Sequence, residues 1–149
     1  MTEEWICKSE WTKEDESANF SALSTRFNDT VVPVAICDSK DFNDQKRITM
    51  TMQEFVKHCA ESTTSKQIFY LKDWHMVQQF PDFSGYCTPL YFQDDWINEF
   101  WDHLNRASEG NKDDYRFVYV GNKGSFTPLH KDVFRSYSWS TNIVGTKLW

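Results

Sequence analysis

His130 and Asp132, in the segment TPLHKD, are the residues whose types and spacing most favour chemistry. In an extended segment, residues i and i+2 project from the same face, so this imidazole and this carboxylate would point the same way. Together they can share a small cation, and a second histidine would complete the two-histidine, one-carboxylate triad typical of non-haem Fe(II) oxygenases. A lone His-x-Asp triplet is weak evidence, and a loop histidine beside a surface aspartate is the alternative.

The residues around this pair strengthen the metal hypothesis. Lys147 follows a Gly-Thr turn and is expected on the next strand, where its ammonium could bind the carboxylate of an acidic cosubstrate. Thr127 can add a hydroxyl, and Tyr70, in an upstream apolar segment, can add a phenol. These groups suit 2-oxoglutarate, whose 2-oxo acid end would chelate the iron and whose far carboxylate would contact the lysine.

Composition excludes several other classes of function. The chain has 149 residues, a formal net charge of −6 and no basic cluster, which argues against direct binding to nucleic acid. Its 4 cysteines form no C-x-x-C pair, so neither a structural zinc site nor a disulfide framework is expected. No apolar stretch approaches the roughly 18 residues of a membrane span. We expect one domain without a membrane segment, located in the cytoplasm or alternatively the nucleus.

Hydrophobic patterns predict the elements that must position these residues. Before residue 110 they predict a strand over 30–37, a turn-rich loop over 39–47, a helix over 49–62, a strand over 66–74 and a helix over 94–106. Pro33 suggests that the first strand lies at a sheet edge or that the proline stands near its start. Thr49 or Thr51 is the expected N-cap of the first helix. The second helix carries an apolar stripe made of Trp96, Phe100, Trp101 and Leu104.

The C-terminal part reads as a series of short extended segments. A strand is predicted over 115–121, a turn over 122–125, extended segments over 126–134 and 136–144, and the start of a further strand over 145–149. His130 and Asp132 are therefore expected on a strand.

The order of these motifs resembles that of a known enzyme family. From Tyr115 onward a strand, a glycine turn, T-P-x-H-x-D and S-x-N-x-x-G-x-K-x-W follow one another. Upstream, the strings VVPVAIC, FYLKDWH and YCTPLYFQDDWINEFWD also match. From about Thr30 to Trp149, the sequence is similar to jumonji-C domain oxygenases, which use Fe(II) and 2-oxoglutarate.

This resemblance implies a fold and a set of roles. The fold would be α+β and mostly β, with residues 1–110 as an N-terminal region of helices and strands and 111–149 as the first half of a double-stranded β-helix, a cupin-like jelly roll. His130 and Asp132 would be iron ligands. The 2-oxoglutarate contacts would be Tyr70, Thr127, Lys147 and, more loosely matched, Asn142. The nearest branch of the family implies O2-dependent hydroxylation of a lysine in a protein substrate, a translation termination (release) factor.

One part of the family pattern has no counterpart in the sequence. The family's second histidine ligand follows the lysine by several strands, whereas this chain ends two residues after Lys147. His58 and His103 fall on predicted helices and His75 ends a predicted strand, so none is expected to replace it. We therefore expect a single, C-terminally incomplete jumonji-C domain with unpaired strand edges and exposed apolar faces. Two alternatives stay open: a non-catalytic binding or regulatory form, and a histone or arginine demethylase of the same superfamily.

Overall fold

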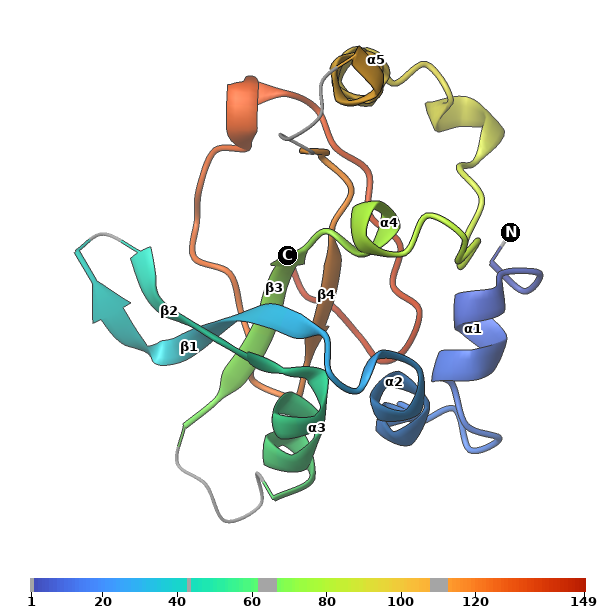
Figure 1. The fold of residues 1–149 in the computed structure, drawn as a ribbon. Coiled ribbons are helices and arrows are strands. Elements are labelled where there is room, and N and C mark those ends of the chain that lie inside the picture. The colour runs from blue at the N-terminus through green and yellow to red at the C-terminus, as the bar shows by residue number, and fades with distance from the viewer. Residues whose placement is uncertain (1, 43, 62–66, 108–112) are drawn as a thin grey trace.

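A four-stranded antiparallel sheet, in the spatial order β2-β1-β3-β4, organises the computed structural model (Figure 1). The structure describes residues 2–42, 44–61, 67–107 and 113–149. The strands are β1 (Val31–Asp41), β2 (Asp44–Thr51), β3 (Phe69–Trp74) and β4 (Val118–Gly121). Sheet and helices together give the expected α+β architecture, consistent with part of a jelly roll. The expected boundary near residue 110 lies outside the described residues and stays a prediction.

Helices lie before, between and after the strands. They are α1 (Ile6–Trp11), α2 (Phe20–Phe27), α3 (Met52–Glu61), α4 (Met76–Gln79) and α5 (Trp96–Ala107), with 3-10 turns η1 (Leu90–Phe92) and η2 (Val133–Arg135). Figure 1 shows α3 close to the sheet and α2 beside α3, while α5 lies at the opposite end of the molecule. None of the helices in the described residues has the length and apolar character needed to cross a membrane.

One face of the sheet forms the hydrophobic core. The cross-strand pairs at its centre are apolar: Val34 opposite Ile48 and Leu71, and Leu71 opposite Val120. Phe27 of α2 contacts Trp74 edge-on, with ring centroids 5.1 Å apart. Helices α2 and α3 cover this face and exclude water from it, because their buried side chains belong to the same cluster.

Thr51 starts α3 with a reciprocal cap, as predicted. Its hydroxyl accepts a hydrogen bond from the backbone N–H of Glu54 at 3.2 Å, and the Glu54 carboxylate accepts one from the backbone N–H of Thr51 at 2.8 Å. This capping box satisfies two donors that the first helical turn leaves unpaired. The predicted apolar stripe of α3 is also confirmed, since Met52, Phe55 and Cys59 are buried.

The predicted loop over 39–47 is wrong in most of its length. Strand β1 continues through Asp41 and β2 begins at Asp44, so polar residues that read as a loop form a hairpin. Backbone pairing between the two strands holds this segment extended. β1 is also an interior strand, and Pro33 is its third residue, just before the stretch that pairs with β3. The proline therefore stands near the strand start, where it removes no hydrogen bond to β3.

The C-terminal segment departs furthest from prediction. Of the strand predicted over 115–121 only Val118–Gly121 is present, as β4. The turn over 122–125 is present and is closed by Ser125 N–H donating to the Asn122 carbonyl at 3.0 Å. Within 126–149 the structure contains no strand, because no neighbouring backbone is available there for ladder pairing. His130 and Asp132 therefore lie on an irregular segment, not on a strand as expected.

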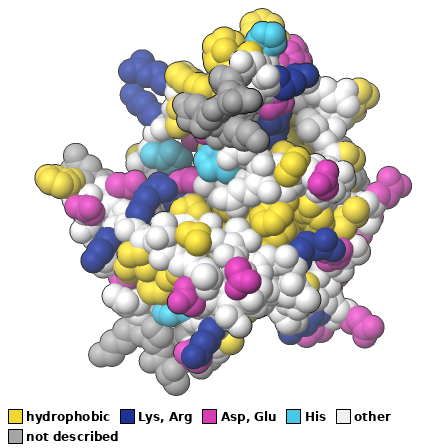
Figure 2. Space-filling model, viewed as in Figure 1, with side chains coloured by type: hydrophobic (Ala, Val, Ile, Leu, Met, Phe, Trp, Pro, Cys, Tyr) yellow, Lys and Arg dark blue, Asp and Glu magenta, His cyan; other side chains and the backbone are white. Residues whose placement is uncertain are grey.

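Helix α5 has exposed apolar side chains. The stripe of α5 faces solvent in part, with Trp96 at 74% and Phe100 at 58% exposure. Figure 2 shows hydrophobic side chains at the end of the molecule where α5 lies. Three of the four cysteines, Cys7, Cys37 and Cys59, are buried.

The core assignment predicts a large loss of stability on removal of Phe27. Its ring contacts Trp74, Phe80 and Phe83 and is 2% exposed. We expect Phe27→Ala to lower the free energy of unfolding by about 3–5 kcal/mol, measured by urea denaturation. The matched control is Phe42→Ala, because Phe42 is 97% exposed. Equal losses in the two variants would contradict the assignment.

Candidate active site

His130 and Asp132 lie in direct contact. The Nε2 atom of His130 is 3.1 Å from Oδ1 of Asp132, and both side chains are partly exposed to solvent. The second oxygen of Asp132 accepts a hydrogen bond from the Ser138 hydroxyl at 2.7 Å. This hydroxyl holds the carboxylate so that Oδ1 stays directed at the imidazole, the kind of support that orients metal ligands in proteins.

The contacts of His130 determine which atom can bind a cation. Its Nδ1 atom lies 2.8 Å from the carbonyl oxygen of Pro128, which can only accept a hydrogen bond. Nδ1 must therefore carry a proton, and in the neutral ring Nε2 presents a lone pair towards the Asp132 carboxylate. Two acceptors 3.1 Å apart repel each other unless a proton or a cation lies between them. The pair is thus arranged to receive a positive charge.

Tyr70 and Thr127 are also brought together. Burial raises the pKa of the Tyr70 phenol, and a hydrogen bond with the Thr127 side chain opposes that rise. The residue before Thr127 is held at the sheet, because Gln45 Nε2 of β2 donates a hydrogen bond to the Phe126 carbonyl at 3.1 Å. Gly121 allows β4 to approach, since a Cβ there would lie 2.8 Å from the Tyr70 ring. Tyr70 and Thr127 therefore form one hydroxyl-bearing surface.

Lys147 and Asn142 make contacts elsewhere in the C-terminal segment. The Lys147 ammonium is 4.0 Å from the ring centroid of Trp149, a cation–π contact at an exposed position. Asn142 donates from Nδ2 to the carbonyl of Gly145 at 2.5 Å, which closes the turn before the lysine. Neither of them contacts Tyr70, Thr127 or the His130–Asp132 pair in the described structure. Their roles towards 2-oxoglutarate stay predictions.

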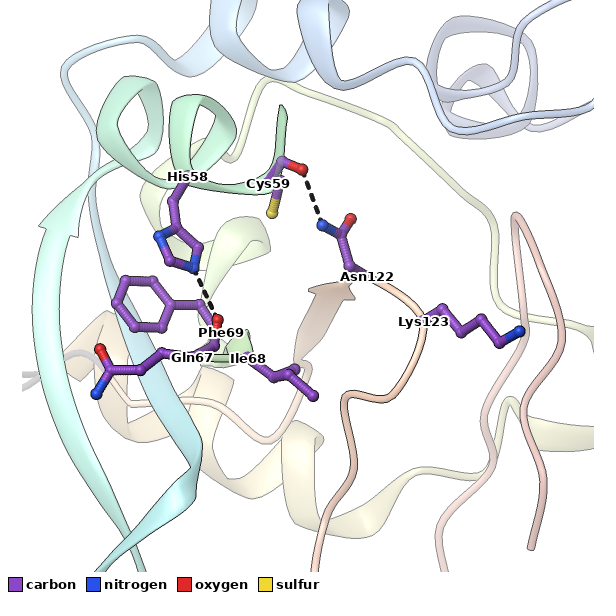
Figure 3. A pocket seen from close by; sticks show the side chains of 7 residues that line it. All are labelled: His58, Cys59, Gln67, Ile68, Phe69, Asn122 and Lys123. Carbon is purple, nitrogen blue, oxygen red and sulfur yellow. Dashed lines mark hydrogen bonds between the residues drawn. The ribbon is translucent and has the colours of Figure 1, made fainter. Parts of the chain in front are cut away.

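The other histidines have different environments. His103 is exposed on α5, and His58 stacks on Phe69 with centroids 3.7 Å apart. Figure 3 shows His58 lining a small pocket, with Nε2 near the Gln67 carbonyl. That pocket is lined without any carboxylate and does not resemble the His130–Asp132 pair. In the part of the chain that the structure describes, no group of three His, Cys, Asp or Glu side chains could hold a metal ion.

An ion network that sequence reasoning missed connects α5 to the residue that follows β3 and to the segment that precedes β4. Arg116 donates two hydrogen bonds to Asp102, at 3.0 and 2.7 Å, and its Nη1 lies 3.9 Å from the Asp114 carboxylate. Asp114 in turn contacts Nδ1 of His75 at 2.5 Å. Burial raises the pKa of Asp114, and its contact with His75 opposes this. These residues are spread over 75–116 at no regular spacing, so no motif signals their contact.

Comparison with known proteins identifies the fold. A family model described as a cupin-like domain matches residues 1–149. This chain belongs to the cupin-like domain family. The 2-oxoglutarate and iron-dependent oxygenase JMJD4 of Danio rerio is 46% identical over 154 residues, and its Homo sapiens counterpart is 38% identical. The arginine-specific demethylase JMJ20 of Arabidopsis thaliana is 45% identical over 159 residues. The resemblance to jumonji-C oxygenases is therefore confirmed.

These alignments include all of this cupin-like chain but only part of each relative. They cover 100% of the chain and 35%, 34% and 36% of the Danio rerio, Arabidopsis thaliana and Homo sapiens proteins. The chain thus spans about a third of the length of these relatives. The JMJD4 proteins are named as dependent on iron and 2-oxoglutarate.

The ion network predicts how stability changes in acid. Hydrogen bonds from Arg116 hold the pKa of Asp102 below its ordinary value of 3.8, although burial opposes this. A depressed folded-state pKa adds stability above about pH 3.8, and this contribution is lost as the pH falls through the folded-state pKa. We expect Asp102→Asn to be less stable than wild type at pH 7, with the difference shrinking below pH 3.8.

Urea denaturation at a series of pH values measures this difference. Arg116→Gln should lose at least as much stability as Asp102→Asn, because Arg116 also approaches Asp114. The double variant should lose little more than Arg116→Gln, because both changes break the same pair. A stability difference that stays constant from neutral to acidic pH would contradict the assignment.

Proposed function

We propose that this chain supplies the metal-binding and cosubstrate-binding beginning of an Fe(II)- and 2-oxoglutarate-dependent protein hydroxylase. The observation that carries the proposal is the 3.1 Å approach of His130 Nε2 to Asp132 Oδ1. Neighbouring ligands at right angles, each about 2.1 Å from a metal, lie about 3.0 Å apart. The separation of the two atoms is therefore that of adjacent ligands in an octahedral site.

The remaining residues would complete the site around this pair. Ser138 keeps Asp132 oriented, while Tyr70 and Thr127 offer hydroxyl groups to a carboxylate of 2-oxoglutarate. Lys147 would pair with the far carboxylate after leaving Trp149, and Asn142 would contact the iron-side carboxylate. When bound, Fe(II) and 2-oxoglutarate supply the oxidising chemistry with O2. We place the third ligand, a second histidine, in the two thirds of the relatives' length that this chain does not span.

The proposed substrate is a lysine side chain of a translation termination factor. Its support is the motif resemblance together with the identity to JMJD4 proteins over the whole chain. Such a substrate would locate the reaction in the cytoplasm, with the nucleus as the alternative.

A second candidate function is arginine demethylation. The 45% identity to the arginine-specific demethylase JMJ20 favours it nearly as strongly as the identity to JMJD4 favours an oxygenase of that type. The two candidates share the same iron chemistry, because each oxidises a C–H bond. A demethylase oxidises the methyl carbon attached to the target nitrogen, whereas a lysyl hydroxylase oxidises a carbon of the lysine side chain. They differ in the product: the substrate of a demethylase loses a methyl group, and the substrate of a hydroxylase gains an oxygen atom. A non-catalytic binding form is the third possibility, and it requires no iron.

The metal proposal predicts that His130→Ala abolishes Fe(II) binding. We expect anaerobic calorimetric titration of the folded chain with Fe(II) to show one weak site in wild type, because only two of three ligands are present, and none in His130→Ala. His103→Ala is the matched control, because that imidazole is exposed on α5. Retained Fe(II) binding in His130→Ala, or its loss in His103→Ala, would refute the assignment.

Mass spectrometry of candidate substrates separates the possible reactions. A protein that carries this chain and the remaining length of its relatives would be incubated with Fe(II), 2-oxoglutarate and either a release factor or methylated histone peptides. Hydroxylation adds the mass of one oxygen to a lysine of the release factor, whereas demethylation removes a methyl group from arginine. We expect the first result. Methyl loss alone would favour the second candidate, and no change with no succinate would favour the non-catalytic form.

A further inference from the structure

Asp73 sits at an irregularity of the sheet next to the candidate site. The pairing of β3 with β4 shifts between Leu71 and Trp74, so Lys72 and Asp73 together oppose the single residue Tyr119. Leu71 and Trp74 both point into the core. The two intervening residues therefore belong to the opposite face, which also carries Tyr70. A bulge of this kind redirects side chains and is frequent beside active sites.

The backbone at Asp73 adopts a conformation that few residues other than glycine favour. Its φ angle is +62°, in the left-handed region. Aspartate and asparagine tolerate this region better than most residues, yet the conformation persists only where the surroundings enforce it. The enforcement here comes from the carboxylate, which is held from two sides.

Two neighbouring strands donate to the Asp73 carboxylate. Arg47 of β2 donates from Nη1 to Oδ2 at 2.7 Å, and Tyr119 of β4 donates its hydroxyl proton to Oδ1 at 2.7 Å. The contact with Arg47 reaches across β1, which lies between β2 and β3. One carboxylate thus links three strands on the face that carries the candidate site.

Tyr119 passes this constraint on to Tyr70. The two ring centroids lie 5.9 Å apart with an interplanar angle of 36°. Tyr70 also lies against Gly121 of β4, where there is no room for a Cβ. The Tyr70 ring is therefore in contact with the Tyr119 ring and close to the backbone of β4, and its hydroxyl is hydrogen-bonded with the Thr127 side chain.

We propose that Asp73 is a positioning residue: through its hydrogen bond to Tyr119 it sets the place of the Tyr70 phenol that receives a carboxylate of 2-oxoglutarate. The inference rests on the proposed function, because it assumes that Tyr70 contacts 2-oxoglutarate. Asp73 itself does not touch the cosubstrate. The alternative is a purely structural link between β2, β3 and β4.

Two single variants and their combination test the inference. Asp73→Gly keeps a residue suited to positive φ and removes the carboxylate that accepts from Arg47 and Tyr119. Tyr119→Phe keeps the ring and removes the donor. We expect each change to weaken binding of 2-oxoglutarate about tenfold, as loss of one hydrogen bond would. The double variant should be weakened no further, because both changes break the same link.

Binding would be measured anaerobically by calorimetric titration of the Fe(II)-loaded chain with 2-oxoglutarate. Circular dichroism at the assay temperature reports whether each variant is folded. Glu10→Gln is the matched control, because it removes another arginine–carboxylate pair, with Arg26, at 2.6 Å in the helical region. It should leave the affinity for 2-oxoglutarate unchanged.

The outcomes separate this inference from the proposed function. Unchanged affinity in both single variants, additive losses in the double variant, or losses that appear only where the fold is lost would each overturn the positioning role. If Tyr70→Phe weakens binding while Asp73→Gly does not, the proposed function stands and the inference falls. If wild type binds no 2-oxoglutarate, the proposed function fails and the inference fails with it.

Discussion

Burial of one face of the sheet is the constraint on which the rest of the structure depends. Val34, Leu71 and Trp74 point into the core against α2 and α3, and side chains alternate along each strand. The alternate positions therefore face the other way, where Tyr70 meets Thr127. A one-residue slip of β3 would exchange the two faces and place the phenol in the core, so the apolar packing also determines where the polar groups lie.

The bulge in β3 modifies this alternation at one point. Because Lys72 and Asp73 oppose only Tyr119, two successive polar side chains reach the same face and the core pairing resumes at Trp74. A carboxylate in this position can accept from both Arg47 and Tyr119. The backbone conformation at Asp73 is unfavourable for most residues, and these two hydrogen bonds help to maintain it.

The polar and the apolar side chains of α5 differ in how far the rest of the fold provides partners for them. Arg116 pairs with Asp102 of α5 and approaches the buried Asp114. The guanidinium group thus compensates the negative charge of both carboxylates, although Asp102 is only partly buried. The apolar stripe of the same helix is left facing solvent, with Trp96 largely exposed. Local helical periodicity shows that a stripe exists, but contact with another element is needed to bury it. The segments predicted as extended after residue 125 are a similar case: they form no strand in the structure, because a strand needs a neighbouring strand to pair with.

How much of this could be predicted depended on the range of the interactions involved. Local signals sufficed for the capping box of Thr51 and Glu54, for the amphipathic pattern of α3, and for the β-rich apolar runs that became β1 and β3. The motif around His130 and Asp132 indicated the family, which the match to the cupin-like domain confirmed. In each of these cases the information lies within a few neighbouring residues.

Other features were decided only by the tertiary structure. Residues 39–41 and 44–47 became parts of strands because β1 and β2 pair, and residues 126–149 stayed irregular for want of a partner strand. The contacts of Asp73 with Arg47 and Tyr119, and of Asp114 with His75, join positions separated by 26 to 46 residues. No local pattern encodes such pairs, because hydrogen bonds of this kind depend on which backbones the folded sheet brings side by side.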